Sequence, residues 1–165
     1  MGGEREVTAP PPRRGRGWGE GEGACLVIGI GNPSRGDDAL GPLCIERLAA
    51  LNLPGVELLT DFQLQVEYAL DLAGRREVVF VDAAESGPEP YDFRVATPCE
   101  GLAHTSHALA PEAVLAACAR IGVTPPEAAY VLAIRGQAFE LGEGLSEAAA
   151  RNLEAALDLL RAKLG

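Results

Sequence analysis

Two apolar runs limit the fold of this 165-residue chain more than any other feature of its sequence. Cys25–Ile30 and Val78–Val81 carry apolar residues at successive positions, so both faces of an extended strand would be apolar. Such strands are typical of a parallel sheet that is covered on both sides. Strands that alternate with helical patterns favour the same architecture. We therefore expect an α/β fold of three layers, in which a twisted, mostly parallel sheet of about five strands lies between helices.

The remaining elements follow from periodicity and from helix-start signals. Pro42 is tolerated only in the first turn of a helix, so the first helix should begin near Asp38 or Ala39. Ser146 is a suitable N-cap for the last helix. Periodicity of the apolar residues predicts strands at 24–30, 56–60, 76–82, 91–96 and 129–134, and helices at 40–51, 65–72, 111–120 and 146–164.

Residues 1–23 differ in composition from the rest of the chain. Gly, Pro, Arg and Glu dominate this segment, and it has no apolar stretch of the kind found in a signal peptide. We expect a disordered tail over residues 1–23, followed by a single α/β domain over residues 24–165.

The charge of the chain excludes two classes of partner. The tail holds four Arg and four Glu, so the whole net charge of −10 belongs to residues 24–165. Residues 24–165 are therefore acidic enough that they should repel nucleic acid and anionic membranes. A cation or a basic segment of a partner would suit it better.

The four cysteines lie far apart in the sequence, and no two of them form a C-x-x-C pair. Cys25 is in an apolar strand pattern, and Cys44 and Cys118 are in apolar helical patterns. Buried free thiols in a reducing cytoplasm are the expected state.

Three side chains that can bind a metal are expected at the carboxyl edge of the sheet. Asp38 follows the first strand in "GIGNPSRGDDALG", Asp82 ends the strand "VVFVD", and His107 precedes a helix in "HTSHALAPEA". Sites in open α/β sheets form at this edge. Two carboxylates and an imidazole suit a divalent transition metal with open coordination positions. Asp37 or Asp38 could instead cap the following helix, and we expect His104 to be a solvated loop residue.

Two other chemistries could use the same segments. A dinucleotide-binding turn needs its third glycine where Ser34 stands, and Asp61 would then bind a ribose. A serine hydrolase could use Ser34, Asp82 and His107, but Asn32 stands where a nucleophile elbow needs glycine.

Four segments together resemble the [NiFe]-hydrogenase maturation endopeptidases. They are "GIGNPSRGDDALG", "VVFVDAAESG", "SHALAPEAVLA" and "VLAIRGQAFELGEGLSEAA", and the resemblance covers about residues 25–163. The family often has Glu followed by Gly where this chain has Asp38 and Ala39. The stretches "TDFQLQVEYALDLAG" and "AIRGQAFELGEGLS" resemble most the branch that serves soluble, NAD-coupled bidirectional hydrogenases.

The resemblance implies both an activity and a site. It implies a cytoplasmic endopeptidase that removes the C-terminal extension of the hydrogenase large-subunit precursor after nickel has been inserted. Asp38, Asp82 and His107 would be the catalytic residues and the ligands of that nickel, which the precursor supplies; no organic cofactor is implied. A chaperone that checks the nickel site without cutting would use the same three ligands.

Overall fold

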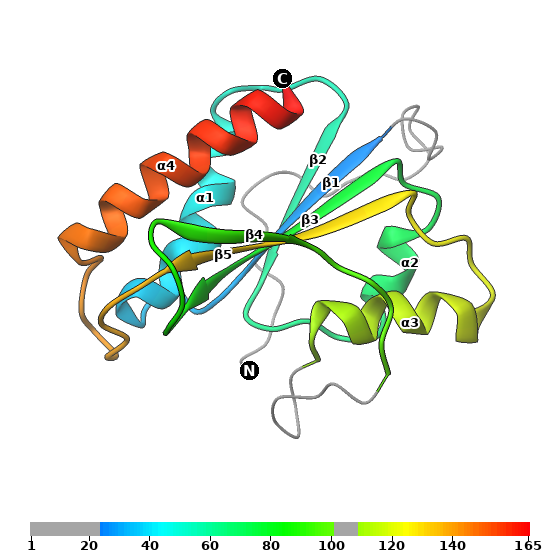
Figure 1. Ribbon diagram of the computed structural model, residues 1–165, viewed down its shortest axis with the longest axis horizontal. Helices are drawn as coiled ribbons and strands as arrows, with labels where there is room; N and C mark the ends of the chain where they lie inside the picture. The colour runs from blue at the N-terminus through cyan, green and yellow to red at the C-terminus, as the bar shows by residue number, and fades with distance from the viewer. Residues whose placement is uncertain (1–23, 101–108) are drawn as a thin grey trace.

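A five-stranded sheet forms the centre of the molecule (Figure 1). The computed structural model describes residues 24–100 and 109–165. The strand order is β2-β1-β3-β5-β4, and every neighbouring pair is parallel except β4 with β5. The strands are β1 (Cys25–Ile30), β2 (Val56–Asp61), β3 (Glu77–Ala84), β4 (Tyr91–Val95) and β5 (Ala128–Arg135). The expected three-layer α/β fold is confirmed, with β4 as an antiparallel edge strand.

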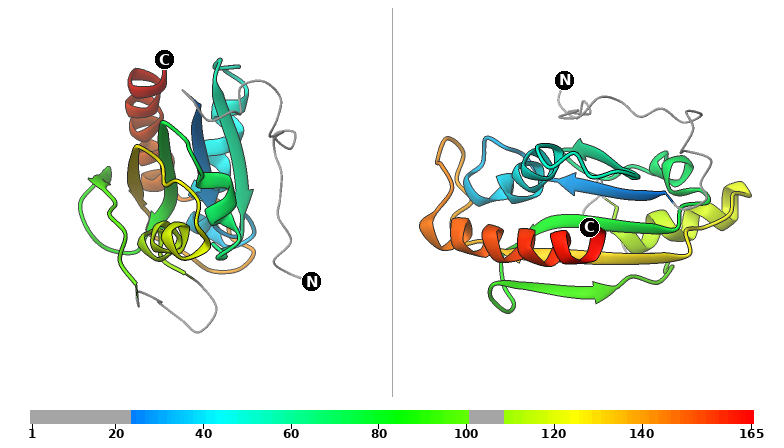
Figure 2. Two further views of the ribbon diagram at one scale, coloured as in Figure 1. Left: turned by 90° about the vertical axis from the view of Figure 1, so that its right-hand side faces the viewer. Right: turned by 90° about the horizontal axis from the view of Figure 1, so that it is seen from above.

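Helices cover both faces of the sheet, and two further views show its twist (Figure 2). The helices are η1 (Gly36–Ala39), a 3₁₀ turn, and α1 (Leu40–Ala49), α2 (Tyr68–Leu72), α3 (Pro111–Ile121) and α4 (Glu147–Leu164). Buried residues of α1 and α4 form one core cluster with the sheet, and those of α2 and α3 form another on its opposite face. The alternate side chains of β1 and β3 divide between the two clusters, which explains why both strands are apolar throughout.

The predicted helix starts are present with their expected chemistry. Ser146 caps α4, because its hydroxyl accepts a hydrogen bond from the backbone N–H of Ala149 at 3.2 Å. Pro111 occupies the first turn of α3, where its missing N–H costs no hydrogen bond. The first helix is preceded by the 3₁₀ turn η1, so the chain already coils at Gly36.

Two elements differ from the sequence prediction. β3 runs to Ala84, so Asp82 lies inside the strand and not at its last position, because Ala83 and Ala84 still pair with β5. The second helix was expected at residues 65–72, but α2 covers Tyr68–Leu72. Residues 65–67 form a turn instead, in which the N–H of Tyr68 bonds to the carbonyl of Gln65.

α1 approaches β1 more closely than side chains would permit. A Cβ atom on Gly29 would meet the carbonyl oxygen of Gly41, and a Cβ atom on Gly41 would meet that of Ile30. Both positions therefore need glycine, because a backbone atom cannot move aside. This contact fixes the end of β1 against the start of α1, and the loop between them follows from it.

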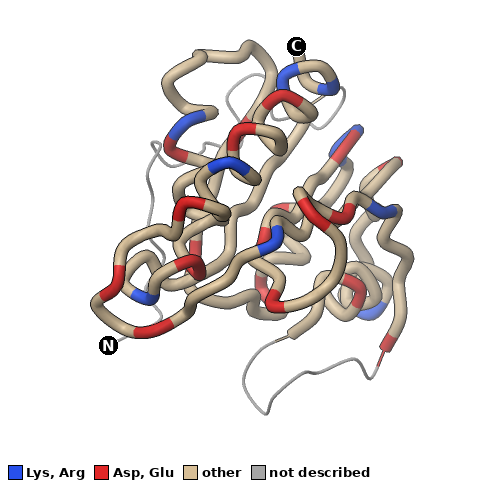
Figure 3. Tube along the Cα trace, turned by 60° about the vertical axis from the view of Figure 1, so that its left-hand side comes forward, with Lys and Arg blue, Asp and Glu red and all other residues tan. Residues whose placement is uncertain are grey.

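The predicted tail at residues 1–23 lies outside the described residues, as do His104 and His107. Acidic positions occur in every layer of the described trace, and basic positions are fewer (Figure 3). None of the described helices has the length and apolar character that a membrane span requires.

The four cysteines should differ sharply in reactivity, and this is our first prediction. Cys25, Cys44 and Cys118 are buried and free, whereas Cys99 is exposed. Burial also raises the pKa of Cys44 to about 12, which suppresses the reactive thiolate. Iodoacetamide should modify the native protein once, at Cys99, and the denatured protein four times, as counted by intact-mass measurement. Rapid modification of Cys118 in the native state would show that α3 is not packed on the sheet.

Candidate functional site

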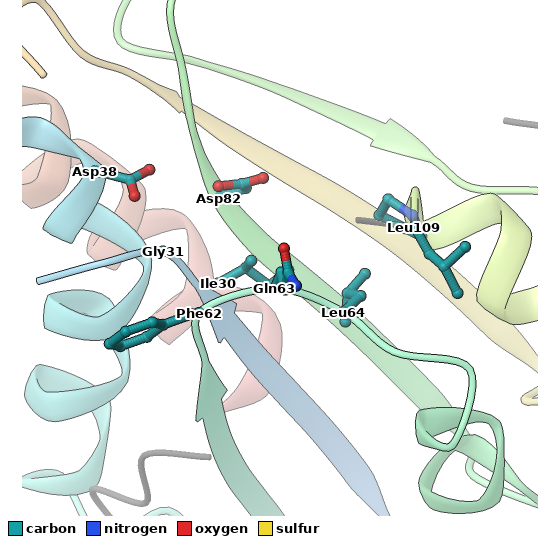
Figure 4. Close-up of a pocket in the computed structure, with 9 residues that line it drawn as sticks. Ile30, Gly31, Asp38, Phe62, Gln63, Leu64, Asp82 and Leu109 are labelled. Atoms are coloured by element: carbon teal, nitrogen blue, oxygen red, sulfur yellow. The ribbon is translucent and has the colours of Figure 1, made fainter. Parts of the chain in front are cut away.

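A cavity of about 230 Å³ opens at the carboxyl edge of the parallel strands. Its wall includes residues at or after the ends of β1 and β2, one residue of β3, and the residues that lead into α3 (Figure 4). The polar side chains that line it are Asp38, Gln63 and Asp82, and apolar side chains such as Ile30, Phe62, Leu64 and Leu109 complete the wall. Asp38 and Asp82 are thus brought together as the sequence predicts.

Asp38 enters the cavity from η1. Its Oδ2 atom accepts a hydrogen bond of 2.7 Å from the backbone N–H of Asn32, which closes the loop after β1. Burial raises the pKa of Asp38 and the charge of Glu85 adds to this, although the Asn32 hydrogen bond and the charge of Arg35 act in the opposite direction. Gly31 makes room for this turn, because a Cβ atom there would collide with the carbonyl oxygen of Asp38.

Asp82 reaches the cavity from inside β3. Its Oδ1 atom accepts a hydrogen bond of 2.8 Å from the N–H of Ala83. Burial raises the pKa of Asp82 to about 7, and the charge of Asp38 contributes in the same direction. Two carboxylates that share a cavity repel each other when both are ionised, and a bound cation would remove that repulsion.

Asp37 points away from the cavity and binds a different part of the chain. It is fully buried, and its carboxylate accepts hydrogen bonds from the segment at residues 137–146. Burial alone would raise its pKa, but the hydrogen bonds from Ser146, Ala138 and Gln137 outweigh burial and lower the pKa. Neither Asp37 nor Asp38 caps α1, because neither makes a side-chain cap hydrogen bond.

The third predicted ligand, His107, lies outside the described residues. Within the described ranges no group of three His, Cys, Asp or Glu side chains is arranged to hold a metal ion. Leu109 and Pro111 do line the cavity, so the chain reaches it two residues after His107.

Ser34 and Asp61, which the two alternative chemistries require, do not line the cavity. Ser34 is exposed in the turn after β1 and is not among the residues that line the cavity. Asp61 is buried, and its carboxylate accepts hydrogen bonds from the Tyr68 hydroxyl and the Phe62 N–H, each at 2.7 Å. Asp61 is therefore held by its own neighbours and is not presented to a ribose.

Sequence reasoning missed two parts of the site. Phe62, Gln63 and Leu64 line the cavity, and they could have been found, since they directly follow β2 at the same sheet edge. The bonds from Asp37 to Gln137 and Ser146 had no such signal, because the partners lie 100 and 109 residues away in the sequence.

Replacing Asp82 should make the protein more stable at high pH, and this is our second prediction. The folded protein binds the Asp82 proton up to about pH 7, whereas the unfolded chain releases it near 3.8. Stability should therefore fall as the pH rises through that window, and this loss should be absent in Asp82→Asn. With chelator present, we expect Asp82→Asn to exceed wild type by about 2–4 kcal/mol at pH 8 and by much less at pH 5.

Urea denaturation at the two pH values measures this, with Asp158→Asn as the control for loss of an exposed carboxylate. An Asp82→Asn variant that is less stable than wild type at pH 8 would contradict the prediction.

Comparison with solved structures places this fold among known proteins. A [NiFe] hydrogenase maturation protease, HycI from Thermococcus kodakarensis KOD1, is 30% identical, with a TM-score of 0.64 over 86% of this chain and 92% of that one. The hydrogenase 2 maturation peptidase of a Thaumarchaeota archaeon is 27% identical, with a TM-score of 0.64 over 86% and 98%. The hydrogenase maturating endopeptidase HybD of E. coli shares the fold, with a TM-score of 0.68 and 23% identity over 86% and 91%.

No family model and no curated protein sequence matches the chain. The similar structures nevertheless align with most of this chain and over most of their own length, and one of them is 30% identical in sequence. Together with the shared fold, they show that this chain belongs to the hydrogenase maturation endopeptidase family.

Proposed function

We propose that this chain removes the C-terminal extension of the nickel-loaded large-subunit precursor of a [NiFe]-hydrogenase, and that Asp38, Asp82 and His107 bind the precursor's nickel. The observation that carries the proposal is the convergence of Asp38 and Asp82 on one cavity from two different elements. The names of the similar proteins, which are hydrogenase maturation proteases, support the activity. The acidic body and the absence of a membrane-spanning helix among the described residues fit a cytoplasmic enzyme that acts on a protein.

The electrostatics of the cavity support a cation as the bound species. Burial raises the pKa of both carboxyl groups, and the charge of Asp38 raises that of Asp82 further. A divalent cation stabilises the ionised forms, so binding should release protons and should weaken as the pH falls. An organic cofactor is not needed for this chemistry.

The path of the chain supports His107 as the third ligand. Leu109 and Pro111 are part of the cavity wall, and α3 fixes Pro111 at its first turn. His107 precedes Leu109 by two residues, whereas His104 is three residues further back. A ligand must be held in a fixed orientation, and a residue close to a helix start is held more rigidly than one deeper in a loop.

The nickel would come with the precursor and would identify it as ready for cleavage. A site of carboxylate and imidazole would also accept zinc or copper, because affinity for such sites generally follows the Irving–Williams order. Selection for nickel must therefore come from the precursor, which presents the metal. Bound nickel could also polarise a carbonyl or activate a water molecule for the cleavage step.

A non-cleaving chaperone that checks the nickel site is the second candidate. It would use the same cavity and the same ligands. The two functions differ in one observable, which is the mass of the precursor before and after incubation with the protein.

Ligand variants test the assignment, and this is our third prediction. Asp38→Ala, Asp82→Ala and His107→Ala should each lower cleavage of the nickel-loaded precursor by at least about 100-fold, because each removes one ligand. His104→Ala is the matched control and should stay within about threefold of wild type. Mass spectrometry of the precursor and a nickel titration measure both effects. An inactive His104→Ala with an active His107→Ala would show that the ligand lies three residues earlier.

Replacing Ser34 distinguishes the metal-dependent reaction from a serine hydrolase, and this is our fourth prediction. Ser34→Ala should keep most of its cleavage activity, because the serine is exposed in a turn and does not line the cavity. A fall on the order of 10⁴-fold in kcat would instead indicate a nucleophile. The same precursor assay gives the answer.

A further inference from the structure

We propose that Asp37 is a positioning residue for the cleavage reaction, which holds Asp38 in the cavity by binding the backbone of residues 137–146. The inference rests on the proposed function, because it concerns the placement of a proposed ligand. Asp37 is not among the residues that line the cavity. It would therefore act through the neighbouring residue, Asp38.

The carboxylate of Asp37 takes four hydrogen bonds from one segment of the chain. Oδ2 accepts from the backbone N–H of Gln137 at 2.6 Å, from that of Ala138 at 3.0 Å and from the Ser146 hydroxyl at 2.7 Å. Oδ1 accepts from the backbone N–H of Ser146 at 2.8 Å. The N–H of Asp37 donates in turn to the carbonyl of Ala138 at 2.7 Å. All of these bonds are made inside the protein, where Asp37 has no exposed surface.

These bonds connect η1 to two rigid elements. Gln137 follows β5 by two residues, and Ser146 is the N-cap of α4. Hydrogen bonds to an ionised group are stronger than those between neutral groups. We therefore expect the bonds between Asp37 and residues 137–146 to be strong. η1 is thereby attached to a strand of the sheet and to the longest helix, as well as to β1.

Packing around Asp37 leaves little freedom for the contact to change. A Cβ atom on Gly136 would lie 2.8 Å from the Cβ of Asp37, and one on Gly36 would collide with the carbonyl oxygen of Ala138. The backbones of η1 and of residues 136–138 therefore meet at these two points without room for further side-chain atoms. We expect a shift of the 137–146 segment to be transmitted to η1.

Asp38 is the next residue on η1, so the bonds that fix the backbone of Asp37 also help to fix the position of Asp38. Its own side chain is tied to the loop after β1 through the N–H of Asn32, whereas the backbone of η1 is tied to the rest of the fold through Asp37. A ligand displaced by about 1 Å can cost on the order of 100-fold in rate. Loss of the Asp37 bonds should therefore affect the reaction step, not only the stability of the fold.

The test uses two kinds of variant in the full-length protein. Asp37→Asn keeps the shape of the side chain, but its amide nitrogen is a donor that would face N–H groups and could not accept from them. Ser146→Ala removes one of the four bonds together with the side-chain N-cap of α4, and Ser146→Thr keeps a hydroxyl that can make both. Asp158→Asn removes an exposed carboxylate of α4 as the control, and Asp38→Asn tests the proposed ligand itself.

Each variant is assayed for cleavage of the nickel-loaded precursor at a temperature at which circular dichroism shows it to be folded. We expect kcat of Asp37→Asn to fall at least about 10-fold, with KM within about twofold of wild type. Ser146→Ala should show a smaller fall in kcat, and Ser146→Thr and Asp158→Asn should be normal. A merely structural role would lower the unfolding temperature and leave kcat per folded molecule unchanged, and that result overturns the inference.

Three further outcomes are informative. If Asp37→Asn does not fold, the Ser146 variants decide: a reduced kcat in Ser146→Ala that Ser146→Thr restores supports the inference, and a normal kcat in Ser146→Ala overturns it. If Asp38→Asn cleaves the precursor normally, the proposed site is wrong. An inactive Asp38→Asn beside a fully active Asp37→Asn refutes the positioning role alone.

Discussion

The close contact between β1 and α1 is the constraint on which the rest of the site depends. Gly29 and Gly41 let two backbones meet without intervening side chains. The chain must therefore turn sharply between them, and Asp38 reaches the carboxyl edge of the sheet on that turn. A larger residue at either glycine would move α1 outward, together with everything that packs on it. The glycines of the first motif thus permit the close approach of β1 and α1, while Asp38 lines the cavity and Asp37 binds residues 137–146.

Asp37 and Asp38 are adjacent residues of the same type, but their different surroundings shift their pKa values in opposite directions. Asp37 is surrounded by N–H and O–H donors, which lower its pKa despite burial. Asp38 faces the cavity, where burial and the negative charge of Glu85 raise its pKa. The hydrogen bonds therefore favour the ionised form of the first carboxylate, which is an acceptor within the fold. The second carboxylate lines the cavity, as the proposed metal ligand must.

How much of the fold and of the candidate site could be predicted from the sequence depends on how far apart in the sequence the interacting residues lie. The apolar runs of β1 and β3, the Pro111 start of α3 and the Ser146 cap are local patterns, and the structure confirms them. Asp38 and Asp82 were predictable as cavity residues, because parallel strands bring their carboxyl ends to one edge. The attachment of Asp37 to residues 137–146 was not predictable, since it depends on how the layers pack. The extension of β3 to Ala84 was missed for the same reason: its cause is pairing with β5.

The position of Asp82 inside β3 has a consequence for the adaptability of the site. Residues on both sides of it pair with β5, so its backbone is part of the sheet and not of a loop tip. A group anchored in this way cannot follow a ligand by backbone movement, and reorganisation on binding is confined to its side-chain torsions. Little conformational entropy remains there to be lost, which favours tight association with a partner of matching shape. Under the proposed function, the precursor would therefore have to adapt its own conformation to the position of this carboxylate.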